Sequence, residues 1–479
     1  MEDHCELQEV IIEAPGPKLK KSLSLVHCVA IIVAISGHSA IFISPTSILQ
    51  SAGSPGAAVI VWLVGGLINM GLALCFAELG TMFPTAGGPY AFVLKGLGPL
   101  PGFLLVYGYV TLIAGPIWSF ISYTAALYIV KPIFPDCENT SMNLGVKLLA
   151  GWILVTVVVA NCLYMKYVRR IQTFLSSTKI TALLLIIIGG IYELALGETE
   201  YLDSPFAGTT EEPGGMAIAI FYSIFSYGGW QVMTIMSEEL KRPERDLPRS
   251  VYIALPVITI KYCLINILFF TLISPNELMK TTAAALLFTE RLYRPLSGLM
   301  SVLVATTSIG ALNAAIMGHS RLLFAGARVG QMPRLFGMIH VQYLTPWPAI
   351  IILLIWTLIM LFTGTLTTMM QLTAFCTISM GIAVVITLLY LRYKQPQFSR
   401  PYKTYLIIPI IELLVGIGLL VLAIYQKPYT IGMGLLVILS GIPLYWFGVL
   451  WTNKPKKFNN LVGEYRCNVS VILSIIRIR

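Results

Sequence analysis

Charged residues are scarce in this chain. Asp, Glu, Lys and Arg together make up 11% of its 479 residues, against about 25% in soluble domains. Hydrophobic residues make up 57% of the chain. This composition excludes an ordinary soluble domain and indicates a protein that is embedded in a membrane.

Motifs for catalysis and cofactor binding are also missing. The sequence has no HExxH zinc motif, no Gly-rich phosphate loop with its lysine, and no paired carboxylates inside its apolar runs. We therefore predict no catalytic residues, no cofactor and no metal site, and we do not expect an enzyme or an ATP-driven pump. Residues 1–21 are polar and lack the apolar core of a cleavable signal peptide.

The chain instead contains a succession of apolar runs, each close to the roughly 20 residues that a membrane helix needs. Strands of a β-barrel would be shorter and alternating, so helices are predicted. Twelve runs are expected, at residues 22–50, 56–82, 97–130, 145–165, 173–195, 214–237, 250–275, 295–325, 346–364, 367–391, 406–425 and 430–451. The predicted organisation is an N-terminal segment at 1–21, a twelve-helix membrane domain at 22–452 and a C-terminal tail at 453–479.

Basic residues gather after every second run. Lys166, Arg169 and Arg170 follow the fourth run, and similar clusters follow the sixth, eighth, tenth and twelfth runs. The loop after the fifth run carries only acidic charges. By the positive-inside rule, both termini are expected in the cytoplasm. The net charge of +10 is therefore interpreted as a topology signal, and no nucleic-acid binding is predicted.

Two of the runs are interrupted by small and polar residues, at 36–40 in the first run and at 226–231 in the sixth. These are matching places if runs 1–5 and 6–10 form two inverted halves, and such a pair is typical of a transporter binding site. An unwound stretch exposes N–H and C=O groups that a cavity or ligand must satisfy. The alternative interpretation is a pair of packing glycines, which are common in membrane helices.

Four further residues are singled out by their position. Lys179 lies inside the fifth run, where an ionisable residue indicates function, unless its side chain extends to the membrane surface. His319, in the eighth run, is interpreted as a packing histidine. Cys137 is the single cysteine in a predicted outside loop, which leaves an intermolecular disulfide or a free thiol. Asn139 begins a glycosylation acceptor pattern in the same loop, a weak signal.

Several stretches together resemble a known family. They are "AIIVAISGHSAIFISPTSILQSAGSPG", "CFAELGTMFPTAGGPYAF", "YIVKPIFPDC", "SIFSYGGWQVMTIMSEELKRPERDLPRS", "GHSRLLFAGARVGQMP", "SRPYK" and "LSGIPLYWFGVLWTNKPK". They resemble the light chains of heteromeric amino-acid transporters, most closely the L-type branch, within the amino acid–polyamine–organocation superfamily. The resemblance runs from about residue 25 to about residue 458. It implies an all-α membrane protein with twelve transmembrane helices: a five-plus-five inverted repeat with broken helices 1 and 6, plus two extra helices.

The resemblance also implies roles for individual residues. Cys137 matches the cysteine that bonds a single-span glycoprotein heavy chain, and Lys179 matches the lysine that stands where sodium sits in sodium-coupled relatives. Phe225 matches the aromatic residue that closes over bound substrate. The other implied substrate-binding residues are Tyr227, Gly228, Gly229 and Gln231 in the unwound part of span 6, and Trp118 and Thr377 near the side-chain pocket.

The sequence departs from the family in the first broken span. The family has Gly-Ser-Gly before Ile-Phe, whereas this chain has His38-Ser39-Ala40 before Ile41. Gly37 still favours an unwound stretch, and the segment from Gly37 to Ile41 is still expected to bind the substrate backbone. Three readings of His38 stay open: it supplements carboxylate binding, it points away, or it fills the site.

The resulting expectation is a sodium-independent exchanger of amino acids, most of all large neutral ones, in the lipid bilayer of the plasma membrane. It would work with a disulfide-linked heavy chain. The alternative is a divergent, non-transporting or sensor-like relative whose substrate site is degenerate.

Overall fold

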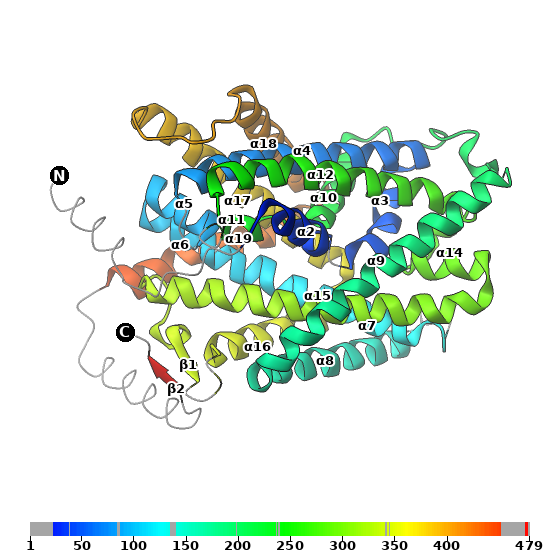
Figure 1. The fold of residues 1–479 in the computed structure, drawn as a ribbon, viewed down its shortest axis with the longest axis horizontal. Helices are drawn as coiled ribbons and strands as arrows, with labels where there is room; N and C mark the ends of the chain where they lie inside the picture. Colours follow the sequence, from blue (N-terminus) through cyan, green and yellow to red (C-terminus); the bar gives the residue numbers. More distant parts are fainter. Residues whose placement is uncertain are drawn as a thin grey trace.

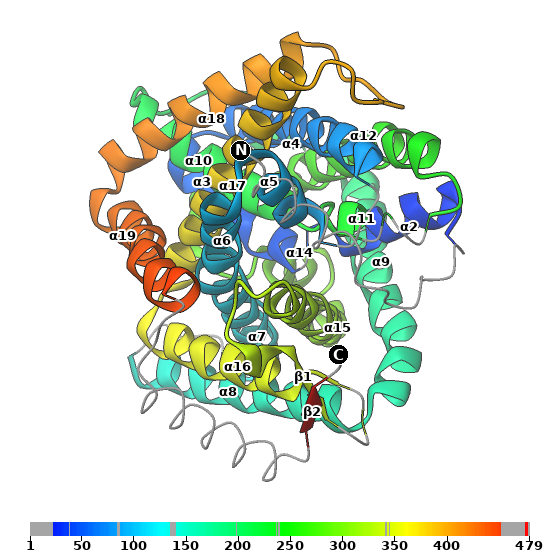
Figure 2. The same ribbon diagram turned by 90° about the vertical axis from the view of Figure 1, so that its left-hand side faces the viewer.

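The chain folds into a bundle of helices whose axes run mostly side by side. The computed structural model describes residues 23–37, 39–83, 87–134, 140–197, 199–235, 237, 240–340, 343, 345–451 and 475–477. Figure 1 shows the long helices lying along one direction, and Figure 2 views the bundle nearly along them. The expected domain ends at 1–21 and 453–479 lie almost entirely outside the described residues, so those boundaries stay predictions.

The first half of the described chain consists of α2 (Leu25–Ile35), the 3-10 turn η1 (Ala40–Phe42), α3 (Ser44–Ala52), α4 (Pro55–Met82), α5 (Gly88–Leu97), α6 (Pro99–Gly108), the π-helical turn η2 (Tyr109–Ala114), α7 (Gly115–Val130), α8 (Thr140–Leu163), α9 (Met165–Ala195) and the short turn η3 (Glu200–Leu202).

The second half consists of α10 (Pro213–Tyr227), α11 (Val232–Ile235), α12 (Pro243–Phe269), α13 (Pro275–Lys280), α14 (Ala284–Leu292), α15 (Arg294–Arg328), the turn η5 (Arg334–Gly337), α16 (Trp347–Thr363), α17 (Leu366–Lys394), α18 (Ile407–Gln426), α19 (Pro428–Tyr445) and the π-helical turn η6 (Trp446–Leu450). Two three-residue strands, β1 (Met338–His340) and β2 (Ile475–Arg477), pair antiparallel.

The predicted all-α membrane fold is confirmed. Among the described residues, nine helices are long and apolar enough to cross a membrane, and three shorter apolar helices are α2, α10 and α16. Together they account for the twelve expected runs. The helices α2 and α10 are short because they end at the interruptions. The third, α16, has 17 residues.

The last two helices stand apart from the other ten. In α18 and α19, 17% of the most apolar stretch of the helix is buried inside the protein, against 72% in α17. Figure 2 shows both helices at the outer edge of the bundle. Their remaining apolar surface suits contact with lipid, so they fit the two helices expected outside the repeat.

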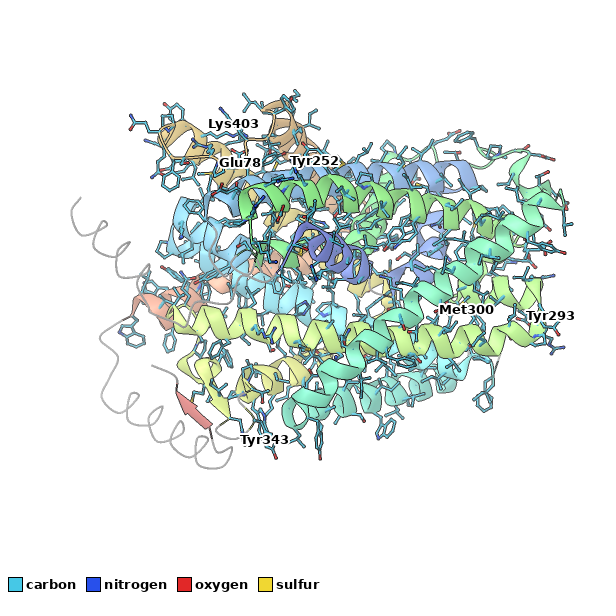
Figure 3. The ribbon with its side chains drawn as sticks, viewed as in Figure 1. Glu78, Tyr252, Tyr293, Met300, Tyr343 and Lys403 are labelled. Carbon is cyan, nitrogen blue, oxygen red and sulfur yellow. The ribbon has the colours of Figure 1, made fainter. Side chains whose placement is uncertain are left out.

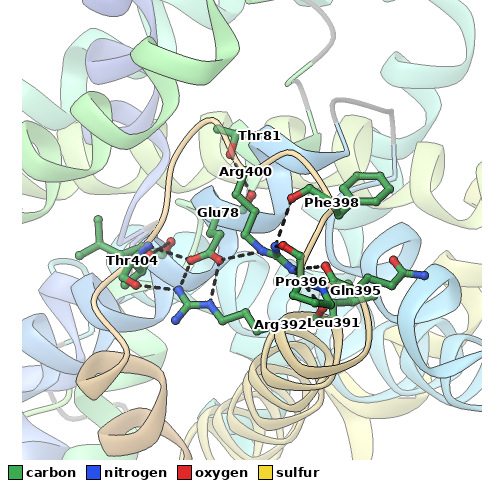
Figure 4. A network of polar contacts seen from close by, with 10 residues as sticks. Glu78, Thr81, Leu391, Arg392, Gln395, Pro396, Phe398, Arg400 and Thr404 are labelled. Carbon is green, nitrogen blue, oxygen red and sulfur yellow. Dashed lines mark hydrogen bonds and ion pairs between the residues drawn. The ribbon is translucent and has the colours of Figure 1, made fainter.

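A buried ion pair connects the end of α4 to the end of α17, and a hydrogen bond connects the same carboxylate to the segment between α17 and α18. Arg392 donates from Nε to Glu78 Oε1 at 2.9 Å and from Nη2 to Glu78 Oε2. The Thr404 N–H donates to the same Oε2 at 2.8 Å. Arg400 lies close by, with its Nε 3.9 Å from Oε1. Figure 3 places Glu78 toward the end of the bundle opposite Tyr293, and Figure 4 shows the network in detail.

Candidate functional site

The two interruptions lie against each other at the centre of the bundle. The chain leaves helical geometry at Ser36 (ψ 135) after α2 and at Gly228 (ψ 154) after α10. The Gly37 N–H then donates to the Gly228 carbonyl at 3.0 Å. Gly37 and Gly229 adopt φ values of 80 and 114, which favour glycine. Both runs are therefore true breaks, joined through their backbones.

Lys179, on α9, binds the end of the first half-helix. Its Nζ donates to the carbonyl oxygen of Ser36 at 2.6 Å and to that of Ala34 at 3.2 Å. Tyr262 donates its hydroxyl to the same Ser36 oxygen at 3.3 Å. The lysine side chain thus turns into the protein instead of reaching for the membrane surface. Its ammonium occupies a position suited to a monovalent cation, because the carbonyls that end a half-helix carry partial negative charge.

A cavity of about 280 Å³ adjoins the breaks. It extends between α9, α10, α15, α17 and the η2–α7 segment. The predicted site residues that line it are Lys179, Phe225, Gly228, Gly229, Gln231 and Thr377. Lining residues that the sequence did not single out for the site include Ile35, Tyr109, Gln172, Thr307, His319 and Arg321. His319, interpreted from sequence as a packing histidine, is therefore also part of the cavity wall.

The other predicted site residues do not line this cavity. Gly37, Ser39, Ala40 and Ile41 are buried, because the first break faces the second one and Tyr262. Tyr227 is held in the core, where its hydroxyl donates to the Trp62 carbonyl at 2.9 Å.

Trp118 is also fully buried, behind His319. His38, Cys137 and Asn139 fall outside the described residues.

One end of the cavity is closed by packed side chains. Phe225 meets the edge of Phe120, with ring centroids 4.9 Å apart. Beyond them, the Tyr128 hydroxyl donates to the Phe42 carbonyl at 3.0 Å, and Gln371 donates to the Tyr222 hydroxyl at 2.7 Å. The opposite end of the cavity is lined by Gln172 and Arg321, which lie toward the start of α9 and the end of α15.

The polar groups around the cavity have a one-sided charge. Among the described lining residues, Lys179 and Arg321 are basic and none is Asp or Glu. In addition, the buried hydroxyls of Ser36, Ser39 and Thr373 have no hydrogen-bond partner among the described residues. Buried polar groups are normally paired. Of these three, only Thr373 lines the cavity and is available to a bound polar molecule, whereas Ser36 and Ser39 belong to the first break beside it.

Comparison with known families identifies the family of the chain. The family model described as amino acid permease matches residues 23–449. The chain belongs to the amino acid permease family. The match covers both breaks, Lys179 and every residue that lines the cavity.

Individual relatives of this permease carry transporter names. Large neutral amino acids transporter small subunit 2 of Oryctolagus cuniculus is 38% identical over 450 residues, covering 93% of this chain and 84% of that protein. The human cystine/glutamate transporter is 34% identical over 468 residues, covering 97% and 93%. Asc-type amino acid transporter 1 of Mus musculus is 35% identical over 441 residues, covering 91% and 83%.

These relatives confirm the resemblance to the light chains of heteromeric amino-acid transporters. This permease is therefore a multi-pass membrane protein of amino-acid transport, and the family and relative names point to transporters instead of enzymes.

The first break gives a direct prediction for this permease. A Cβ on Gly37 would lie 1.4 Å from the Tyr262 hydroxyl, at a backbone φ of +80. Gly37→Ala should therefore add about 1–3 kcal/mol of backbone strain and displace Tyr262. We expect amino-acid uptake per surface molecule to fall about tenfold, measured with radiolabelled substrate and surface biotinylation. Gly418→Ala is the matched control, since a Cβ there meets nothing within 4 Å; equal losses in both variants would contradict the prediction.

Proposed function

We propose that this permease exchanges large neutral amino acids across the plasma membrane without sodium, as the light chain of a disulfide-linked complex with a single-span glycoprotein. The observation that carries the proposal is the Lys179 ammonium, bound to two carbonyls of the broken first span beside a cavity whose described lining has no carboxylate.

The position of Lys179 supports sodium independence. A sodium ion at the end of α2 would need the oxygens of Ser36 and Ala34, which already accept from the lysine ammonium. A fixed ammonium supplies the positive charge that a coupling ion would bring, so substrate gradients alone would drive exchange.

The breaks support recognition of the backbone of an amino acid. Gly228 and Gly229 line the cavity, and Ser36 and Ser39, whose hydroxyls have no partner within the described part of the chain, lie in the first break beside it. Unwound backbone offers both N–H and C=O groups, which can bind the carboxylate and the ammonium of one zwitterion.

The charge of the cavity disfavours a cationic side chain. A cationic side chain would lie near Lys179 and Arg321 with no described lining carboxylate to pair with it. Such repulsion in a low-dielectric site is strongly unfavourable. Phe225, Ile113 and Ile117 provide an apolar wall for a large uncharged side chain.

The packing around the cavity supports alternating access. The layer of Phe225, Phe120 and Tyr128 closes the end that the predicted topology assigns to the outside. The end near Gln172 and Arg321 would face the cytoplasm, since α9 starts and α15 ends in basic sequence. This arrangement fits a state that is closed toward the outside, with Phe225 as the gate.

Ala40 favours a transporting protein over the degenerate alternative. Loss of a family glycine would be harmful if the position required a positive φ. Ala40 instead begins the 3-10 turn η1, a right-handed conformation that alanine adopts without strain. The replacement at position 40 therefore leaves a backbone that is compatible with transport.

Leucine exchange tests this function. Cells that co-express the chain with a heavy chain should take up radiolabelled leucine equally in sodium and choline buffers, and unlabelled large neutral amino acids should compete. Cys137→Ser should abolish the disulfide-linked band on a non-reducing gel, whereas Cys263→Ser should not. Absence of leucine uptake in the wild type, with uptake restored by His38→Gly and Ala40→Gly together, would instead support the non-transporting alternative.

A further inference from the structure

Trp118 and His319, which were considered separately in the sequence analysis, form a hydrogen bond at the cavity wall. Trp118, on α7, donates its indole Nε1–H to Nδ1 of His319, on α15, at 3.1 Å. Their ring planes differ by 10°, with centroids 6.2 Å apart. Tyr109 meets the imidazole edge-on, with centroids 5.3 Å apart and an angle of 85°. His319 and Tyr109 line the cavity, whereas Trp118 is wholly buried behind them.

This hydrogen bond determines where the imidazole carries its proton. An indole nitrogen can only donate, so Nδ1 of His319 must act as the acceptor. A neutral imidazole with an accepting Nδ1 carries its hydrogen on Nε2. Protonation of Nδ1 would place two N–H groups against each other and leave the buried indole donor without its partner, which is costly in a dry site.

The charges around the imidazole also disfavour its protonation. The titratable groups that share this cavity wall are Tyr109 from η2, Lys179 from α9 and Arg321 from α15 itself, and Cys376 of α17 lies near Tyr109. The two charged members of this group are both basic. A third positive charge on His319 would be repelled by them, with no described lining carboxylate to offset it.

We propose that Trp118 is a positioning residue that holds His319 as a neutral Nε2–H tautomer, and that the uncharged imidazole makes the cavity less favourable for acidic side chains than a protonated one would. The part about the His319 tautomer concerns the protein alone. The part about substrate selectivity, called the selectivity half below, rests on the proposed transport function.

The tautomer can be measured without any transport. The chain has five histidines, so the His319 signal in ¹³C,¹⁵N-histidine NMR of the full chain in nanodiscs is assigned by its loss in His319→Gln. We expect one neutral Nε2–H tautomer from pH 7.5 to pH 5.5 in the wild type. A wild-type Nδ1–H tautomer, or titration of His319 near the usual value of about 6.5, overturns the proposal without any need for a variant at Trp118.

Selectivity is measured by uptake of leucine and glutamate at the same two pH values. Neither molecule changes its net charge appreciably in this range, because a glutamate side chain titrates near 4.3. In the wild type, the glutamate-to-leucine uptake ratio should change less than about twofold. In Trp118→Phe, which keeps a ring beside the imidazole but removes its donor, the protonated fraction of His319 should rise on acidification, because protonation of Nδ1 no longer leaves a buried indole donor unpaired. The glutamate-to-leucine ratio should rise with it.

The variants His319→Gln and Trp118→Phe/His319→Gln are the matched controls, since glutamine cannot titrate. Their uptake ratios should not depend on pH; persistence of the pH effect in the double variant, or its absence in Trp118→Phe, overturns the selectivity half. A locked tautomer in a wild type that takes up no leucine would refute the proposed function, and the selectivity half with it, while the positioning role of Trp118 would stand.

Discussion

Replacing Lys179 by alanine is expected to lower leucine uptake by more than about a hundredfold, with most of the protein still at the cell surface. The variant removes the lysine donor from the Ala34 and Ser36 carbonyls, and only the longer bond from the Tyr262 hydroxyl stays on Ser36. A buried polar group that loses its partner costs about 1–3 kcal/mol, and both carbonyls lie at the end of the half-helix that shapes the substrate site. The break would refold or collapse, and the cavity would lose its fixed positive charge.

Lys147→Ala is a matched control for this effect. Lys147 also donates to two backbone carbonyls, those of Phe362 at 3.1 Å and Gly364 at 3.2 Å. It lies on α8, however, and does not line the cavity. Uptake per surface molecule should stay within about twofold of wild type, because this lysine is only partly buried and lies away from the cavity. Wild-type uptake by the Lys179→Ala variant would remove the main support for sodium-independent exchange.

The sequence predicted the membrane helices well, because burial in lipid demands long apolar runs whatever their neighbours are. Each of the twelve expected runs corresponds to helix in the described chain. Three short helices were missed, namely α5, α13 and α14. They have 6–10 residues, which is too short to form a recognisable apolar run and depends on contacts with the long helices.

The sequence located the breaks but not the direction in which they face. Gly228 and Gly229 line the cavity, whereas Gly37 is turned toward Gly228 and Tyr262. Spacing along one span cannot reveal this pairing, since it depends on how two halves of the chain meet.

Gln172, His319 and Arg321 were missed as site residues for a related reason. Gln172 and Arg321 lie near the ends of long helices, where polar residues usually indicate the membrane surface. His319 was interpreted as a packing histidine, because the sequence alone does not show which side of α15 faces a cavity. Only the three-dimensional arrangement of α9 and α15 shows that a cavity reaches that far.

Replacing Glu78 by alanine is expected to prevent normal folding and delivery to the cell surface. Glu78 is fully buried and accepts from Arg392 and from the Thr404 N–H. Removing one partner of a buried ion pair typically costs about 3–5 kcal/mol, because the other charge stays buried without compensation. Here the loss would also loosen the segment before α18, since the Thr404 N–H would lose its acceptor, Glu78 Oε2 at 2.8 Å.

Glu277→Ala is the matched control, because Glu277 forms an exposed ion pair with Arg291 (side chains 39% and 53% exposed, respectively). Surface pairs contribute about 0–1 kcal/mol, and loss of the Ser274–Glu277 capping box adds about 1 kcal/mol. Surface expression and the midpoint of thermal unfolding, measured by fluorescence-detected gel filtration, should therefore drop far more for Glu78→Ala than for Glu277→Ala.

Glu78→Gln separates charge from hydrogen bonding in the same network. Glutamine keeps an oxygen that can accept from the Thr404 N–H, but it removes the negative charge that faces Arg392 and Arg400. We expect its thermal midpoint to lie between those of wild type and Glu78→Ala. A Glu78→Gln protein as stable as wild type would mean that the hydrogen bonds, and not the ion pair, connect α4 to the α17–α18 segment.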